Sequence, residues 1–154
     1  MSKPAGEVAP ADMPELRLLN AVFCEDIRHE DNGKDILIGV YSEVMAPSRC
    51  PINLRLSLWI QYEAAQSGET EIMLRLRFGD APQEAPEARV HMSIAEPGEV
   101  TLALRGMPIA IDGSGVLLLE HRLPGEDWTV IARKRVTCPS PSGDETHPPE
   151  AGPE

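Results

Sequence analysis

The sequence predicts an all-β domain, folded as an antiparallel sandwich of two sheets with about eight strands. Three observations predict this class. Apolar and polar residues alternate along several segments, turns containing glycine or proline separate these segments, and no stretch of ten residues shows a convincing helical period. Many short strands with such turns are typical of sandwiches of the immunoglobulin-like or C2-like kind, and an open β-barrel is the alternative.

The clearest alternation lies between Ile52 and Tyr62. A strand directs successive side chains to opposite faces, whereas a helix would scatter the even-numbered positions of this segment around its axis. The segment is therefore predicted to be a strand. Its apolar face consists of Ile52, Leu54, Leu56, Leu58, Ile60 and Tyr62, and its other face of Asn53, Arg55, Ser57, Trp59 and Gln61.

A second alternating segment covers residues 71–78. Its even positions are apolar, and its odd positions include Met73, Arg75 and Arg77. Ser67-Gly68, between the two segments, is a turn signal. We therefore expect residues 52–62 and 71–78 to pair as one long antiparallel hairpin.

The remaining strands follow from turn signals. Asn32-Gly33 between the apolar segments 16–29 and 36–41 predicts a tight hairpin, because both central residues of such a turn need positive φ. Pro97-Gly98, Asp112-Gly113 and Pro124-Gly125 separate the further candidates, and we expect a hairpin turn at 112–115. These candidate strands are residues 89–95, 100–104, 116–122 and 128–136.

The two ends differ from the middle in composition. Residues 1–15 hold three prolines and are predicted to be a flexible lead, and the Pro-rich acidic segment 139–154 has too few apolar residues to offset its ordering entropy and is predicted to be disordered. The sandwich is expected to occupy residues 16–138. A chain of 154 residues can bury a core without disulfide or metal support.

The net charge of −11 comes from 25 acidic and 14 basic residues. An acidic protein repels phosphate groups and anionic lipids, so we expect neither nucleic acid nor a membrane as a partner. The N-terminus has no apolar stretch typical of a secretion signal, and no apolar run is long enough to span a bilayer. We expect a cytoplasmic protein.

Cys24, Cys50 and Cys138 are an odd number of cysteines without a Cys-x-x-Cys spacing. This pattern argues against a disulfide scaffold and against a zinc site built on cysteines. We therefore expect reduced thiols, with Cys24 filling a buried position.

The N-terminal hairpin also carries a resemblance. Cys24-Glu-Asp-Ile-Arg, then Gly33-Lys34, then Ile38-Gly-Val-Tyr41 is similar to the opening of a family of uncharacterised bacterial and phage-associated proteins. The similarity covers about residues 18–42. It implies a bacterial or phage origin and a β fold, and it transfers no functional residues.

The residues around this hairpin offer two kinds of site. Acidic residues near its turn, between Asp31 and Asp35, suggest Ca²⁺-dependent binding, but the dense-aspartate loop pattern of such sites is absent. Cys24 would become a nucleophile only beside a histidine, and of the four histidines only His91 or His121 could serve, because His29 lies on the same strand. A small cysteine-dependent hydrolase or ligand-binding enzyme is therefore an alternative. We expect no metal site, no cofactor and no catalytic residue.

Trp59 is the unusual residue of the best-predicted strand, because it lies opposite the apolar stripe. In the expected hairpin it would sit across from Met73 or Arg75, with Arg55 and Arg77 nearby and able to stack on the indole. Tryptophan, methionine and arginine are typical of protein interfaces, although a loop or a second sheet covering Trp59 explains the same pattern.

The sequence therefore favours a non-enzymatic binding or assembly module that acts through a sheet face or an edge strand. The expected interaction face consists of Trp59, Met73, Arg75, Arg55 and Arg77. The expected partner is another protein or a second copy in a homodimer. The basic run Arg133-Lys134-Arg135 is interpreted as a charged strand edge or a docking place for the acidic tail.

Overall fold

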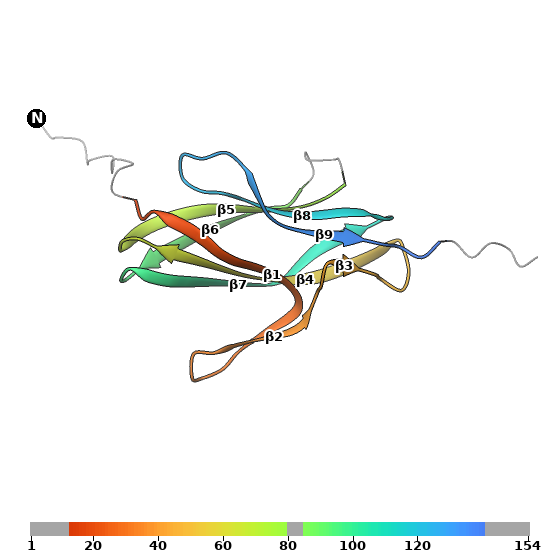
Figure 1. Cartoon of the computed structure of the whole chain (residues 1–154), viewed down its shortest axis with the longest axis horizontal. Helices are drawn as coiled ribbons and strands as arrows, with labels where there is room; N and C mark the ends of the chain where they lie inside the picture. The colour runs from red at the N-terminus through yellow and green to blue at the C-terminus, as the bar shows by residue number, and fades with distance from the viewer. Residues whose placement is uncertain (1–12, 80–84, 141–154) are drawn as a thin grey trace, which may run out of the picture.

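Two sheets packed face to face make up the fold (Figure 1). The computed structural model describes residues 13–79 and 85–140, and these contain nine strands. Sheet A has the order β2-β1-β4-β7, and sheet B has the order β3-β9-β8-β5-β6. The strands are β1 (Leu16–His29), β2 (Asp35–Val40), β3 (Val44–Met45), β4 (Ile52–Ala64), β5 (Gly68–Phe78), β6 (Glu87–Ile94), β7 (Gly98–Ile111), β8 (Gly115–Arg122) and β9 (Thr129–Val136).

The predicted sandwich is confirmed, and the two sheets do not close into a barrel. All strand pairs are antiparallel except the short parallel contact between β3 and β9. The predicted strand at 16–29 has those bounds, whereas β7 extends well beyond the expected 100–104. The lead expected at 1–15 and the tail expected at 139–154 lie almost entirely outside the described residues.

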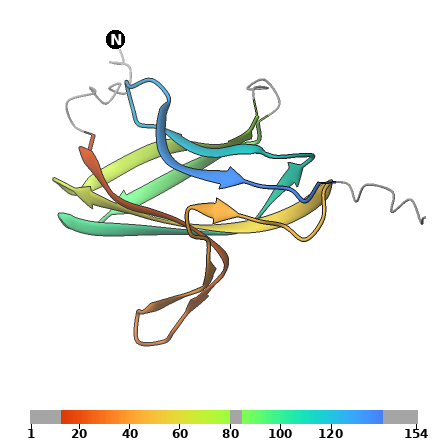
Figure 2. The ribbon, with the colours of Figure 1, turned by 45° about the vertical axis from the view of Figure 1, so that its right-hand side comes forward.

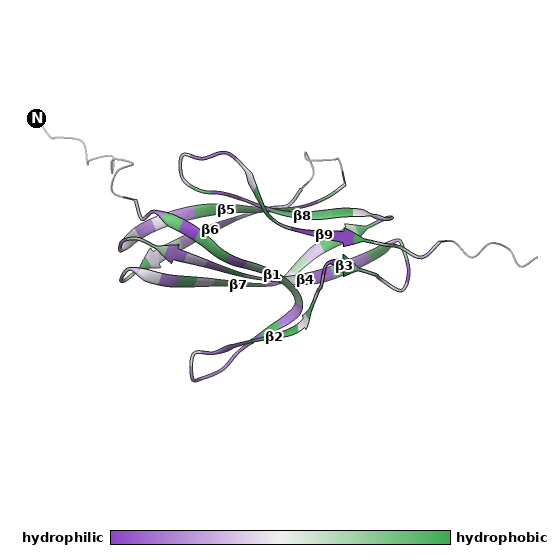
Figure 3. Ribbon diagram, in the orientation of Figure 1, coloured by the Kyte–Doolittle hydropathy of each residue, from purple (hydrophilic) through white to green (hydrophobic). Residues whose placement is uncertain are grey.

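The core confirms the alternation along the two strongest strands. From Leu56 to Tyr62 the even-numbered side chains of β4 are fully buried, as are Ile72, Leu74 and Leu76 of β5. All of them belong to one hydrophobic cluster between the sheets. In Figure 3 hydrophobic and hydrophilic residues alternate along the strands, as expected when one face of each sheet is buried.

The predicted long hairpin of 52–62 and 71–78 is wrong. β4 pairs with β1 and β7 in sheet A, whereas β5 pairs with β6 and β8 in sheet B. The link at 65–67 therefore crosses from one sheet to the other. The expected hairpin turn at 112–115 is wrong for the same reason, because β7 belongs to sheet A and β8 to sheet B. A period of two identifies a buried face, but it does not identify the pairing partner.

The hairpin predicted around Asn32-Gly33 is confirmed, but its turn is not the expected two-residue kind, because residues 30–34 link the strands and Asn32 has no positive φ. β1 and β2 pair from His29↔Asp35 to Cys24↔Val40, and Gly33 has φ of 81° at the turn. Only the first part of β1 pairs with β4, as far as Cys24. The second part of β1 continues with β2 as a two-stranded arm, residues 25–40, which projects from the side of sheet A that faces away from sheet B (Figures 1 and 2).

One buried polar pair joins the sheets. Tyr62 of β4 and His121 of β8 are both buried, their rings stack with centroids 5.7 Å apart, and the Tyr62 hydroxyl lies 2.8 Å from His121 Nδ1. Burial lowers the pKa of His121, although the charge of Glu126 opposes this shift. Burial raises the pKa of Tyr62. The neutral forms of both side chains are therefore favoured in the folded state.

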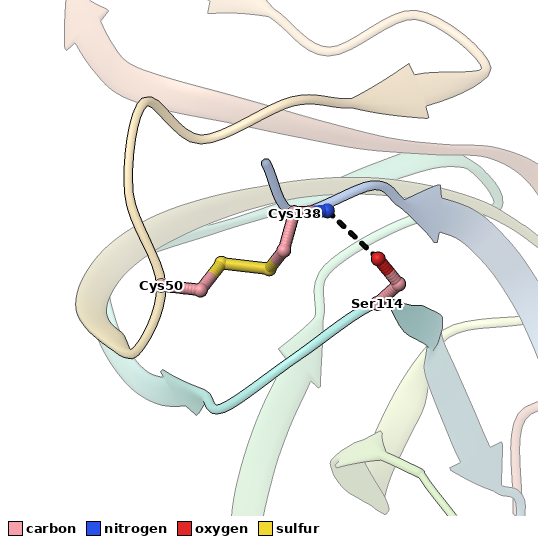
Figure 4. Close-up of a disulfide and its surroundings, with 3 residues drawn as sticks. All are labelled: Cys50, Ser114 and Cys138. Carbon is pink, nitrogen blue, oxygen red and sulfur yellow. Dashed lines mark hydrogen bonds between the residues drawn. A yellow bond between two sulfur atoms is a disulfide. The ribbon is translucent and has the colours of Figure 1, made fainter. Parts of the chain in front are cut away.

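Cys50 and Cys138 form a disulfide, which corrects the expectation of reduced thiols (Figure 4). The two residues are 88 positions apart, with Cα atoms 5.9 Å from each other. The bond joins the loop before β4 to the end of β9, where the Cys138 backbone N–H also donates to Ser114 Oγ at 2.9 Å. The third cysteine, Cys24, is free and buried, as predicted. Three cysteines can form one disulfide and leave one free thiol, so their odd number did not exclude a bridge.

Replacing both bridged cysteines by serine should lower the free energy of unfolding. The bond closes a long loop, so the chain-entropy model predicts a loss of about 4 to 5 kcal/mol, which a urea titration would measure. Reductant should destabilise the natural protein by a similar amount and leave the double serine variant unchanged. Equal stability of the two proteins under oxidising conditions would contradict the prediction.

Stability should fall with pH below 6.5, the ordinary pKa of histidine. The pKa of buried His121 is lowered, so the unfolded chain binds the proton first. The stability that neutral His121 contributes is fully present above the pKa of histidine in the unfolded chain. It is lost as the pH falls through the lower pKa of His121 in the folded protein. Urea midpoints at about pH 8 and about pH 5 should differ less for His121→Gln than for the natural protein. An identical pH dependence in both would refute the role of His121.

Candidate functional site

The outer face of sheet B gathers arginines from several strands. On β5 the even-numbered side chains are buried, so Met73, Arg75 and Arg77 point outward. On β8, Leu117 and Leu119 are buried in the core, which directs Leu118, Glu120 and Arg122 outward. The alternation of the two strands thus decides which side chains reach this surface.

The strand register places these residues in rows. Met73 lies opposite Arg122, Arg75 opposite Glu120, and Arg77 opposite Leu118. On the other side of β8, Leu118 lies opposite Arg133 of β9. Directly opposed residues share one face of a sheet. The arginine face is therefore defined here by Met73, Arg75, Arg77, Val116, Leu118, Glu120, Arg122, Trp128, Val130, Arg133 and Arg135.

Glu120 holds two arginines of this face in place. Its Oε2 accepts a hydrogen bond from Arg75 Nε at 2.7 Å, and its Oε1 accepts one from Arg77 Nη2 at 3.1 Å. The side chain of Glu120 is 6% exposed, and those of Arg75 and Arg77 are 15% and 22% exposed. Partly buried charge-assisted bonds of this kind fix side-chain orientation more firmly than exposed ion pairs do.

Trp128 is the aromatic residue of the arginine face. The guanidinium carbon of Arg75 lies 4.1 Å from the centroid of its ring, and that of Arg122 lies 5.2 Å from it. Both distances are within the range of cation–π attraction. A hollow of about 380 Å³ adjoins this group, and it is lined by Met13, Glu71, Met73, Arg122 and residues 123–126 of the turn between β8 and β9.

The arrangement combines fixed cations with exposed apolar side chains. Val116 and Val130 of the arginine face are among the exposed large hydrophobic residues of the described chain, and β9 contributes Arg133 and Arg135. Guanidinium groups match carboxylates in shape and charge. The face is chemically suited to bind an acidic ligand that also presents apolar groups.

The expected interaction face is only partly assembled. Met73, Arg75 and Arg77 lie together on sheet B, but Trp59 and Arg55 lie on sheet A, where Trp59 pairs with Val22 and Ala103. The predicted contact of Trp59 with Met73 or Arg75 is therefore wrong, because it depended on the hairpin that does not form. Of the expected arginines, Arg75 lies over Trp128 instead, together with Arg122.

Trp59 has a partner in the arm. Its indole Nε1 donates a hydrogen bond to Asp35 Oδ2 at 3.0 Å, and the ring is only partly exposed. A hydrogen bond from His29, and next that from Trp59, hold the pKa of Asp35 below its usual value. The arm therefore covers part of Trp59. Covering by another segment is the alternative explanation that the sequence offered for this residue.

Cys24 is not placed as a nucleophile. Its thiol is buried and contacts the Ser57 carbonyl oxygen at 3.7 Å. Burial, and then the charge of Asp26, raise its pKa, which disfavours the reactive thiolate. His121 is bonded to Tyr62 between the sheets, and His91 lies on β6 beside Glu71. Neither histidine is brought to Cys24 by the strand pairing.

Of the acidic residues of the first hairpin, Glu30 bonds within the turn, and Asp35 is bonded to His29 and Trp59. Asn32 Oδ1 accepts the Lys34 backbone N–H at 3.0 Å, and Asn32 Nδ2 donates to Glu30 at 3.2 Å. Among residues 13–79 and 85–140, no group of three or more histidine, cysteine, aspartate or glutamate side chains has the geometry of a metal site.

Comparisons with known proteins add little to this geometry. No family model matches the chain, and no curated protein matches it. A solved β-glucosidase from Erythrobacter marinus is similar to it, with 11% identity and a TM-score of 0.39, over 80% of this chain and 16% of that one. The described chain also contains no helix that is long and apolar enough to cross a membrane.

The sequence analysis did not identify Trp128 and Arg122 as site residues, although the sequence contains a turn signal that places them near each other. Pro124-Gly125 marks a hairpin turn between segments 116–122 and 128–136, and this hairpin is confirmed as β8–β9. Residues that flank a short turn lie close together, so Arg122 and Trp128 were candidates for contact. The register with β5, which adds Arg75, is not contained in that signal.

Glu120→Ala should lower the free energy of unfolding by about 3 kcal/mol, because it leaves two poorly exposed arginines without their carboxylate. Glu63→Ala is a matched control, since Glu63 pairs with the exposed Arg17. The control should lose less than about 1 kcal/mol. Thermal or urea unfolding would measure both, and equal losses would contradict the structural role given to Glu120.

Proposed function

We propose that this protein is a non-enzymatic binding module whose arginine face recognises a carboxylate-rich segment of a partner protein. The observation that carries the proposal is the fixed group of Arg75, Arg77 and Arg122 around Glu120 and Trp128. Interface centres are enriched in arginine and aromatic residues that lose little freedom on binding.

Charge distribution supports the chemistry of the partner. The whole chain carries −11, but β9 adds Arg133 and Arg135 to the arginine face, and of these Arg135 also pairs with Glu43. A local positive surface on an acidic protein attracts an acidic segment in one orientation, because the rest of the molecule repels it. Nucleic acid is a weaker candidate, since Arg75 and Arg122 lie against the Trp128 ring on which a base would stack.

The disulfide bears on where the module acts. A bond between Cys50 and Cys138 persists in oxidising compartments and is rare in the cytosol. The proposal is therefore a binding module that acts in an oxidising environment, in place of the cytoplasmic setting expected from the cysteine count.

Binding of a fluorescent glutamate-rich peptide, measured by anisotropy at low and high salt, tests this function. The natural protein should bind it more tightly than a lysine-rich peptide of equal length, and Arg122→Ala and Arg133→Ala should each weaken binding about 3- to 10-fold. Arg17→Ala is the matched control, because Arg17 is an exposed arginine of sheet A that pairs with Glu63. Equal losses in all three variants, or no preference for the acidic peptide, would overturn the proposal.

A further inference from the structure

The arm formed by residues 25–40 leaves one strand edge open. β2 is the outermost strand of sheet A, paired with β1 on one side and with no described strand on the other. In Figures 1 and 2 the arm projects from the outer side of sheet A, and the hydrogen bond from Trp59 to Asp35 links it to that side. The backbone N–H and C=O groups of a free edge can pair with another strand.

The open edge is also apolar. Ile36 and Val40 are 43% and 55% exposed, and Leu37 and Ile38 between them are partly exposed. No charged residue occurs between positions 36 and 40. An exposed, uncharged strand edge is one that soluble proteins normally protect, so its presence points to an interaction surface.

The other sheet edges carry such protection. β6 presents exposed Glu87, Arg89 and His91. β7 presents exposed Glu99 and Arg105, and it contains Pro108, which lacks a backbone donor. β3 has only two residues. Among the described edges, β2 is therefore the one that offers a continuous apolar and uncharged segment, residues 36–40.

We propose that β2 pairs antiparallel with β2 of a second copy of this chain, about a twofold axis that passes next to Ile38. In this register Ile36 of one copy lies opposite Val40 of the other, and the two Ile38 residues lie opposite each other. Lys34 reaches the level of Ser42 in the other copy, next to Glu43, whose side chain is 87% exposed while it also pairs with Arg135. The apolar strand is thus complementary to itself, and the residues that flank it, Lys34 and Glu43, have opposite charges, as suits a twofold interface.

The arm is already held in place for this pairing. Asp35 accepts the hydrogen bond from Trp59, and Ile27 on β1 is fully buried outside the main core cluster. Gly39 adopts φ of 63°, and a Cβ at this position would lie 2.6 Å from the Glu25 side chain, so the local bend needs glycine. An edge that is ordered before binding loses little entropy when it pairs.

The dimer is independent of the proposed function. β2 lies on the side of sheet A, and the arginine face lies on the outer side of sheet B. Pairing through β2 leaves both arginine faces accessible, so a dimer would present two of them. Substitutions in the arm therefore test self-association without removing a residue that the proposed function uses.

Light scattering of the full chain across a concentration series tests the proposal. The natural protein should approach twice its monomer mass at concentrations up to about 1 mM. Val40→Lys and Ile36→Lys should return it to the monomer, because lysine on an edge strand opposes pairing. Val116→Lys is the matched control, since Val116 is 44% exposed on sheet B. A natural protein that stays monomeric, or a dimer that Val116→Lys dissociates and Val40→Lys does not, overturns the proposal.

A second variant tests the register itself. Ile38→Cys would bring two cysteines directly opposite each other, at a separation that a disulfide can span. Mild oxidation should give a covalent dimer that reductant dissolves, whereas the natural protein and Val116→Cys should give none. Circular dichroism would establish that each variant is folded. A folded Ile38→Cys protein that forms no covalent dimer, or one no faster than Val116→Cys, overturns the register.

Discussion

The even-numbered side chains of β4 and β5 are buried in one cluster between the sheets, and each sheet supplies the apolar surface that the other lacks. A fully buried aliphatic side chain contributes about 2 kcal/mol relative to an exposed one. β4 and β5 each lie between two neighbours, so their position also sets that of β1, β7, β6 and β8. The register that assembles the arginine face follows from this packing.

Much of this fold could be predicted from residues, because alternation and turn chemistry act locally. The face of Leu58 and Ile60 and the turn at Gly33 are decided by neighbours in sequence. Pairing is different. Residues 52–64 and 68–78 can either hydrogen-bond to each other or belong to opposite layers, and both arrangements bury the same stripes. The choice depends on β1 and β7 competing for β4, which no local pattern records.

The candidate site was predictable to the same extent. Met73, Arg75 and Arg77 alternate on one strand, so their common face followed from the period, but the aromatic residue beside them did not. Trp59 stood out because it broke a pattern, and the structure explains the break by its bond to Asp35. The bridge between Cys50 and Cys138 spans 88 positions and has no local signal either. Long-range pairing is thus the common cause of each error.

β1 belongs to two structures at once, since its first part pairs with β4 and its second part with β2. Cys24 lies where the two pairings meet, and it is registered with both Ser57 and Val40. A tensile load on the arm would therefore pass along β1 into the sandwich. There it would act in shear on the ladder between Leu16 and Cys24, whose hydrogen bonds run perpendicular to the strand and would share the force. Loaded in this direction, the sandwich would resist extension as a mechanical anchor.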